Sequence, residues 1–335
     1  MKFLKSTTFW THLLVFVLAV AVLYLPSLHS SFVLDDHIGI EQNQDIRSID
    51  TVFNTPFTAF RSLLLHTSYS LGQLDPAYYR IMNFVFHLGT VVGIYILVGL
   101  VAESSVIAFF SALIFAVHPI LVESVVWISS LTYPQYSFFV LVSLILYILK
   151  DKVRQKTLFI VLSLVAFFLS LMSSEKALIL PLIILLYEWL FGSLKKNWKP
   201  ITFSLLTLCV FGVIIFPFVQ DRIAIFSASA VTGTTEIMNP LLQIPVVLGT
   251  YLNLIFWPER LTVYHLDEMG VQQSSLILNS LLTLLYFACL IVSYLKNKKI
   301  FFFLSIFFIA SLPALIPIHI IQIAAERYAY LGTFG

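Results

Sequence analysis

Charge and cysteine are both scarce in this chain of 335 residues, and each absence excludes a class of protein. Asp, Glu, Lys and Arg together make up 11% of the residues, hydrophobic residues make up 59%, and the mean hydropathy is +0.96. Because soluble domains carry about 25% charged residues, this composition excludes a soluble globular chain. The two cysteines, Cys209 and Cys289, each lie inside an apolar run, which excludes a disulfide framework.

Two sequence motifs are also missing. No glycine-rich loop followed by the lysine that cradles phosphate occurs anywhere, so an ATP site of that kind is not supported. Pairs of cysteines in CxxC spacing are absent, and His37 and His118 are too widely separated to predict a zinc site. The chemistry must therefore come from the few charged residues that the chain does contain.

Long apolar runs dominate what is present. Runs near the roughly 20 residues needed to cross a bilayer recur from end to end, and spanning segments of this kind must be helical. The first run is too long for a signal peptide, and no small-residue cleavage site follows it, so we expect it to stay as an anchor. We predict an all-α, polytopic membrane protein with about nine spans, near 9–29, 82–101, 105–123, 133–149, 157–173, 177–193, 200–219, 274–295 and 300–320.

The lysines predict how these spans are oriented. Lys and Arg collect in short cytoplasmic loops, and four lysine-rich clusters, at 2–5, 150–156, 195–199 and 296–299, all lie inside only if the apolar stretch Leu241–Trp257 does not cross. Pro245 and Asn253 interrupt that stretch. We therefore predict a re-entrant or interfacial segment within an outer loop at 220–273. The alternative is an ordinary span that breaks the charge rule once.

This topology separates the charged residues by type. Eleven of the 12 lysines fall inside, whereas six of the seven arginines and 14 of the 17 acidic residues fall outside. Arginine suits bidentate binding of phosphate or carboxylate, so we expect the outer face to carry the chemistry. Some of these arginines are expected to serve only as interface anchors.

The first outer loop, 30–81, begins with the adjacent acids Asp35 and Asp36 directly after the first span. Its middle, from Ile46 to Leu71, has apolar residues at near-helical spacing, which favours an amphipathic helix lying on the membrane. Two adjacent carboxylates are weak evidence for a divalent cation such as Mg²⁺ or Mn²⁺.

Other ionisable residues lie near the outer ends of further spans. Arg80 either snorkels to the interface or binds phosphate. His118 and Glu123 interrupt an apolar helix and either face a cavity or form a structural pair, while Glu175 and Lys176 either contribute to a site or neutralise each other. The predicted site residues of the later spans are Glu326, Arg327 and Tyr328.

These segments resemble, in order, those of the GT-C class of polyprenyl-phosphate-dependent glycosyltransferases, and most of all the tetratricopeptide-repeat-linked O-mannosyltransferases and their bacterial relatives. The likeness covers almost the whole chain. The matching blocks are Phe32-Val33-Leu34-Asp35-Asp36, Tyr79-Arg80, His118-Pro119-Ile120 with Glu123 and Trp127, Glu175 with Pro181, Tyr251 to Pro258, and Glu326-Arg327-Tyr328 with Tyr330. Three departures leave the sugar and the acceptor open: Ile81-Met82 stands in place of Pro-Leu, Ser174 stands in place of Lys, and the loop at 129–133 lacks Gly-Arg.

The resemblance implies a single GT-C-like transmembrane domain over 1–335 that moves a sugar, such as mannose, from a polyprenyl-phosphate donor to a hydroxyl of protein or glycan, with inversion. Asp35 would be the base and Asp36 the second acid. Arg80, Arg327 and Lys176 would stabilise the leaving phosphate. The residues left to hold these groups or the sugar are Tyr79, His118, Glu123, Glu175, Glu326 and Tyr328.

The resemblance also implies a truncated chain, because the family continues past the last block into further spans and often into soluble repeats, which are absent here. The lysine-rich inner loops and the abundant Phe and Ile favour a bacterial cytoplasmic membrane, with the active site on its outer side. No nucleic-acid partner is expected. A transporter or flippase for a polyprenyl-linked sugar or other anion is the alternative, although no internal repeat is visible. A non-catalytic scaffold is a third.

Overall fold

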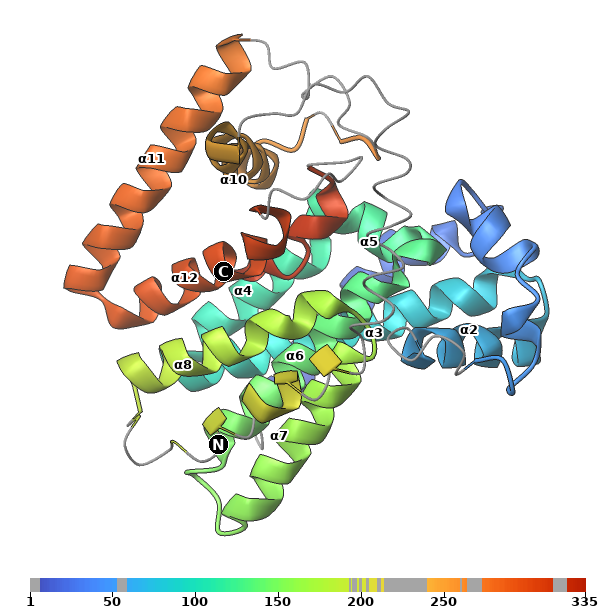
Figure 1. The fold of residues 1–335 in the computed structure, drawn as a ribbon, viewed down its shortest axis with the longest axis horizontal. Coiled ribbons are helices and arrows are strands. Elements are labelled where there is room, and N and C mark those ends of the chain that lie inside the picture. Colours follow the sequence, from blue (N-terminus) through green and yellow to red (C-terminus); the bar gives the residue numbers. More distant parts are fainter. Residues whose placement is uncertain are drawn as a thin grey trace. The chain divides into compact units, whose positions relative to one another are not determined.

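The computed structural model describes residues 7–52, 59–192, 240–259, 261–263, 273–315 and 324–335, together with a few positions between 194 and 213. In these parts of the chain the regular structure is helical and contains no strand (Figure 1), so the all-α prediction is confirmed for them. The chain divides into two compact units at Leu180 and Pro181. Each unit is described by itself.

The helices of the first unit begin and end where the sequence provides caps. Asp75 accepts a hydrogen bond from the backbone N–H of Ala77 at 3.0 Å and precedes Pro76 at the first helical position. Glu103, at φ 60°, ends the same helix in the left-handed region. The described helices of this unit are α1 (Thr7–Tyr24), α2 (Ala59–Gly72), α3 (Pro76–Ala102), α4 (Ser105–Val117), α5 (Val122–Val126), α6 (Thr132–Leu149) and α7 (Lys156–Leu171).

Helix α3 is the central element of this unit. It contacts α1, α2, α4 and α6, and α7 packs on α6. Where α2 lies beside α3 in Figure 1, a buried apolar cluster joins them to the start of α6. The residues of this cluster are Phe32, Ile40, Ile46, Leu65, Tyr79, Ile128 and Leu131. The first outer loop is therefore packed onto the helices through a hydrophobic cluster that it shares with the turn before α6.

Of the amphipathic pattern predicted over 46–71, the part from Ala59 onward is an α-helix in the described residues. A 3-10 turn covers Asp45–Arg47, and α2 begins at Ala59. Phe53 and Phe57, on which part of the pattern depended, lie outside the described residues. The face of α2 that carries Leu65 packs into the cluster above.

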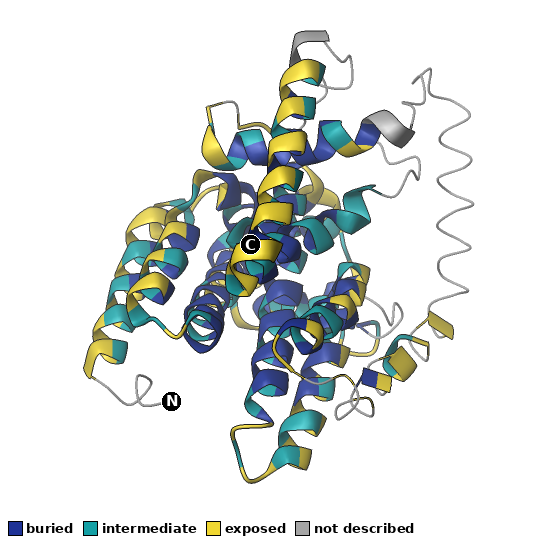
Figure 2. Ribbon diagram, turned by 90° about the vertical axis from the view of Figure 1, so that its left-hand side faces the viewer, coloured by how far each residue is buried: buried dark blue, intermediate teal, exposed yellow. Residues whose placement is uncertain are grey.

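The second unit contains α8 (Leu180–Leu190), α10 (Pro240–Phe256), α11 (Gln273–Lys296) and α12 (Lys298–Leu315) among its described residues. Helix α10 packs on α11, where Asn279 donates to Thr250 Oγ1 at 3.1 Å. Helix α8 packs through aromatic rings, because Tyr187 lies 6.1 Å and Phe191 5.6 Å from the ring of Phe302. Much of α11 is exposed apolar surface (Figure 2), as expected for a helix that faces lipid.

Among the residues that the structure describes, fewer helices are long and apolar enough to span a membrane than the nine that the sequence predicts. Five are long and apolar enough: Thr7–Ser27, Pro76–Ala102, Ile128–Leu149, Leu276–Lys296 and Lys298–Leu315. A sixth is possible if the bent pair Ser105–Val117 and Pro119–Val126 counts as one span. The structure therefore supports a multi-pass helical membrane protein and does not confirm nine spans.

The remaining predicted spans differ in two ways. Helix α7 has 16 residues and α8 has 11, so both are shorter than a span. The span predicted at 200–219 lies largely outside the described residues, as does most of the outer loop at 220–273. Within that loop, α10 has 17 residues with Pro245 inside the helix, and whether it crosses the membrane stays open.

Candidate functional site

The turn after the first span separates the two adjacent acids. Leu34 has φ 50°, a left-handed conformation that non-glycine residues rarely adopt. The backbone N–H of Asp36 then bonds the carbonyl of Val33 at 3.0 Å, and that of His37 bonds the carbonyl of Leu34 at 3.2 Å. The turn leaves Asp35 exposed and Asp36 completely buried. Two identical side chains therefore have different surroundings.

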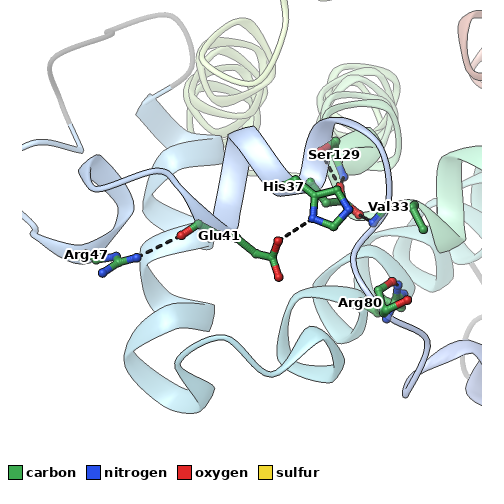
Figure 3. A network of polar contacts seen from close by, with 8 residues as sticks. Val33, His37, Glu41, Arg47, Arg80 and Ser129 are labelled. Atoms are coloured by element: carbon green, nitrogen blue, oxygen red, sulfur yellow. Dashed lines mark hydrogen bonds and ion pairs between the residues drawn. The ribbon is translucent and has the colours of Figure 1, made fainter.

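The buried carboxylate of Asp36 is a structural anchor. Its Oδ1 accepts hydrogen bonds from the backbone N–H and the hydroxyl of Ser129, at 2.8 and 2.5 Å. Its Oδ2 accepts from the backbone N–H of Val33 at 3.2 Å. Hydrogen bonds to a charged acceptor are about twice as strong as neutral ones. Asp36 therefore holds the first outer loop against the turn before α6 (Figure 3).

Arg80 also links the start of the first outer loop to the segment before α6. Its guanidinium donates to four backbone carbonyls, with Nε to Val126 at 3.2 Å, Nη1 to Leu28 at 3.1 Å and also to Ser30, and Nη2 to Ser31 at 2.7 Å. The side chain is 1% exposed. In this arrangement Arg80 holds the chain that leads into the acidic turn. The phosphate-binding role implied by the resemblance stays a prediction, and it would require Arg80 to give up some of these contacts.

Three residues of the turn before α6 are hydrogen-bonded to other parts of this unit. Arg80 bonds the carbonyl of Val126, Asn83 donates to the carbonyl of Trp127 at 2.9 Å, and Asp36 accepts from Ser129. Arg80 and Asn83 both belong to α3, and Asp36 belongs to the loop. Helix α3, through Arg80 and Asn83, therefore holds the segment to which the acidic turn is bonded.

The rim of the loop carries a second polar group. His37 Nδ1 lies 2.5 Å from a carboxylate oxygen of Glu41, and Arg47 donates to the backbone carbonyl of Glu41 at 3.0 Å (Figure 3). These side chains are wholly or partly exposed. The hydroxyl of Tyr79 donates to the carbonyl of Gln73 at 2.7 Å, so this predicted sugar contact supports the loop in the structure.

Arg61 is a member of this region that the sequence analysis did not single out. It is the only charged residue of α2 and is partly buried. Burial lowers the pKa of the Arg61 guanidinium, and the nearby Asp36, Tyr133 and Asp35 oppose that shift. In the described part of the chain, its Nε is buried without a hydrogen-bond partner. Helix α2 reaches α6 here, because the rings of Phe60 and Phe139 lie 5.3 Å apart.

Lys176 approaches the same tyrosine from a different element. It follows Ser174, whose hydroxyl caps the 3-10 helix Glu175–Ile179. Its ammonium lies 5.1 Å from the ring centroid of Tyr133 and 3.7 Å from the carboxylate of Glu175. Tyr136, buried one helical turn beyond Tyr133, is within electrostatic range of both Lys176 and Glu175. Lys176 of the predicted pair therefore lies against Tyr133, a residue that is also within electrostatic range of Arg61.

His118 and Glu123 lie at the bend after α4. The axes on the two sides of the break differ by 54°. His118 has an extended backbone, and its Nδ1 accepts the N–H of Ile120 at 3.3 Å, so the imidazole caps the 3-10 turn Pro119–Leu121. Glu123 is buried on α5. His118 therefore has a local capping role in the structure, while its pairing with Glu123 and its role in sugar binding both stay predictions.

The last predicted block lies in the second unit. Glu326 is 3% exposed, and its Oε1 accepts the backbone N–H of Thr262 at 2.6 Å. The guanidinium of Arg327 lies 5.2 Å from the ring centroid of Tyr328. These contacts show a buried acid and a stacked arginine side by side. Their approach to Asp35 stays a prediction.

The acidic pair does not fit a metal site. Each carboxylate oxygen of Asp36 already accepts at least one N–H or O–H donor. Among the residues that the structure describes, no three His, Cys, Asp or Glu side chains are grouped closely enough to hold an ion. We therefore derive no step through Mg²⁺ or Mn²⁺.

Arg61 is thus within electrostatic range of Asp36, Tyr133 and Asp35, and the ammonium of Lys176 lies near both the ring of Tyr133 and the carboxylate of Glu175. Arg80 and Tyr79 donate to backbone carbonyls of the first outer loop and thereby support it. Comparisons of the chain with protein-family models, curated proteins and solved structures find no match. Function must therefore be argued from this arrangement and from the motifs.

Proposed function

We propose that the chain is a membrane glycosyltransferase of the GT-C type. It would move a sugar from a polyprenyl-phosphate donor to a hydroxyl acceptor, the Ser or Thr of a protein, at the extracytoplasmic face of a bacterial membrane. The observation that carries the proposal is the unequal acid pair, in which Asp35 is exposed on a left-handed turn while Asp36 is buried and bonded to Ser129. The exposed carboxylate of Asp35 is the proposed base, and the hydrogen bonds of Asp36 hold the turn that carries it.

The proposed reaction is a single displacement. Asp35 takes the proton of the acceptor hydroxyl as the acceptor oxygen bonds the anomeric carbon. The bond from that carbon to the phosphate oxygen breaks, and the electron pair leaves with the polyprenyl phosphate. One displacement inverts the anomeric carbon.

Charge builds on the phosphate as it leaves, and cations already held in place lower the cost of that charge. Lys176 is the cation proposed for this role, and its ammonium lies 5.1 Å from the ring centroid of Tyr133. Arg327 belongs to the second unit, and its contribution is part of the proposal. The local strain at Leu34 supports a functional turn, because such strain collects at active sites.

The proposal is tested by reconstituting the protein in proteoliposomes with radiolabelled polyprenyl-phosphate sugars and a Ser/Thr-containing peptide. We expect label to move to the peptide, with the product of opposite anomeric configuration to the donor. Empty liposomes are the control for spontaneous transfer.

A second readout in the same vesicles separates the alternative function. Labelled donor is placed in one leaflet, and its appearance in the other is followed with time. Movement between leaflets without any transfer to acceptors would replace the glycosyltransferase with a transporter. Transfer without such movement would support the enzyme.

A further inference from the structure

Arg61 is a cation within electrostatic range of Asp36, Asp35 and Tyr133, and one of its donors has no hydrogen-bond acceptor among the described residues. Its Nε is buried and unpartnered within the described part of the chain. Burying a donor without an acceptor is unfavourable, so such a group in a candidate site indicates a ligand acceptor. Arg47, in the same outer loop, differs in this respect because it donates to Glu41 and lies over Tyr69.

The surroundings of Arg61 favour an anionic ligand. Lys176 lies against Tyr133, and Arg61 is within electrostatic range of the same tyrosine. Two cations from separate elements, α2 and the 3-10 helix Glu175–Ile179, are thus both within electrostatic range of Tyr133. A planar guanidinium and an ammonium together suit a phosphate group, with the guanidinium providing directed N–H donors and the ammonium a point charge.

The other arginine of this region is already engaged. Arg80 donates to the carbonyls of Val126, Leu28, Ser30 and Ser31, and it is almost completely buried. Using Arg80 for phosphate would release the loop that carries Asp35. Arg61 can bind a ligand without dismantling that support.

We propose that Arg61, together with Lys176, binds the phosphate of a polyprenyl-phosphate lipid, while Arg80 acts as a positioning residue for the acidic turn. The assignment of the lipid rests on the proposed function, whereas the assignment of a phosphate rests on the two cations. The site takes the phosphate of donor and product alike, so product binding reports it without any turnover.

The test measures binding of two lipids to the purified full chain in nanodiscs. Polyprenyl phosphate and the corresponding polyprenol differ only in the phosphate. For Arg61→Gln we expect about 10- to 100-fold weaker binding of polyprenyl phosphate, the range for a lost charged hydrogen bond, with unchanged binding of polyprenol. Arg47→Gln is the matched control, and it should bind both lipids like the native chain.

Arg61→Lys keeps the positive charge but removes the buried Nε donor, and it covers the case in which Arg61→Gln fails to fold. We expect a smaller loss, again confined to the phosphate lipid. Native affinity of either Arg61 variant for polyprenyl phosphate overturns the proposal, and so does a native chain that does not distinguish the two lipids. Free inorganic phosphate that competes as well as polyprenyl phosphate would overturn the lipid assignment.

The outcomes also separate this inference from the proposed function. Arg61-dependent lipid binding without sugar transfer would leave the phosphate site standing and remove the enzyme. Sugar transfer by a chain whose Arg61 variants bind polyprenyl phosphate normally would leave the enzyme standing and remove the phosphate site.

Discussion

Asp36 Oδ1 accepts two hydrogen bonds from Ser129, at 2.8 Å from the backbone N–H and 2.5 Å from the hydroxyl, across 93 residues of sequence. This contact ties the acidic turn to the start of α6. We expect Asp36→Asn to destabilise the chain by about 1.5–3 kcal/mol, because charged hydrogen bonds are lost and a buried donor is introduced. Ser129→Ala removes one donor and should cost about 1 kcal/mol. The melting temperature in detergent should therefore be lowered more by Asp36→Asn than by Ser129→Ala. A larger decrease for Ser129→Ala would contradict the anchoring role of Asp36.

Arg80→Lys tests the support beneath the turn. A lysine ammonium is a compact donor and cannot reach the four carbonyls that the guanidinium now contacts. Each buried carbonyl left without a donor costs about 1–3 kcal/mol. We expect faster hydrogen exchange over residues 28–36 and a lower melting temperature. Arg154→Lys, at an exposed position, is the control, and equal behaviour of the two variants would show that Arg80 does not support the loop.

Leu34→Gly separates stability from activity. Leu34 has φ 50°, and glycine removes a left-handed cost of about 1–2 kcal/mol while adding about 0.5–1 kcal/mol of unfolded-state entropy. We therefore expect little change in melting temperature but slower sugar transfer, because Asp35 is held less firmly. Gln73→Gly and Glu103→Gly, with φ 54° and 60°, relieve similar strain elsewhere and should transfer normally. Full activity of Leu34→Gly would show that the turn conformation does not matter.

Gly249→Ala tests the packing of α10 on α11. A Cβ at this position would lie 2.4 Å from the backbone of Asn279, so the two helices would have to separate. We expect a loss of about 1–3 kcal/mol, the usual cost of overpacking, measured as a lower melting temperature. Gly212→Ala has no atom within 4 Å of the new Cβ and is the control. Equal melting temperatures for the two variants would contradict the close approach.

The folding stability of the chain should decrease in acid as Asp151 becomes protonated. Desolvation raises the pKa of this carboxyl, but hydrogen bonds and charges from Lys150 and Lys156 outweigh it and hold the pKa below the ordinary value of 3.8. The stabilisation is present above pH 3.8 and is lost as pH falls through the lowered pKa. The melting temperatures of the native chain and Asp151→Asn should therefore converge in strong acid. A difference that stays constant with pH would contradict this interpretation. Because Asp151 is partly exposed, the effect should be small and should weaken in salt.

The sequence predicted the helical membrane class because composition alone excludes a soluble chain. The described residues do not confirm its nine spans, in part because hydropathy does not detect where a helix breaks. His118 and Pro119 end α4 after 13 residues, and α8 has only 11. The length of α4 is therefore set by the local hydrogen bonds at the bend. The hydropathy of its residues does not indicate where the helix ends.

The candidate site was predicted only in part. The exposure of Asp35 and the burial of Asp36 depend on Ser129, a contact that no local pattern could indicate. A lone arginine in an amphipathic helix resembles an interface anchor, so Arg61 was missed, although its isolation among apolar residues of α2 was a visible signal. The role of Arg80 could not be inferred because its partners are backbone carbonyls, which sequence does not distinguish.

The most direct measurement of the central claim is single-turnover sugar transfer by Asp35→Asn in proteoliposomes, compared with the native chain and with Asp50→Asn. Asp50 is also an exposed carboxylate of the first outer loop and is the matched control. If Asp35 is the base, its variant should transfer at least about 100-fold more slowly while binding polyprenyl phosphate normally, and Asp50→Asn should behave as native. Native rates in Asp35→Asn would contradict the account.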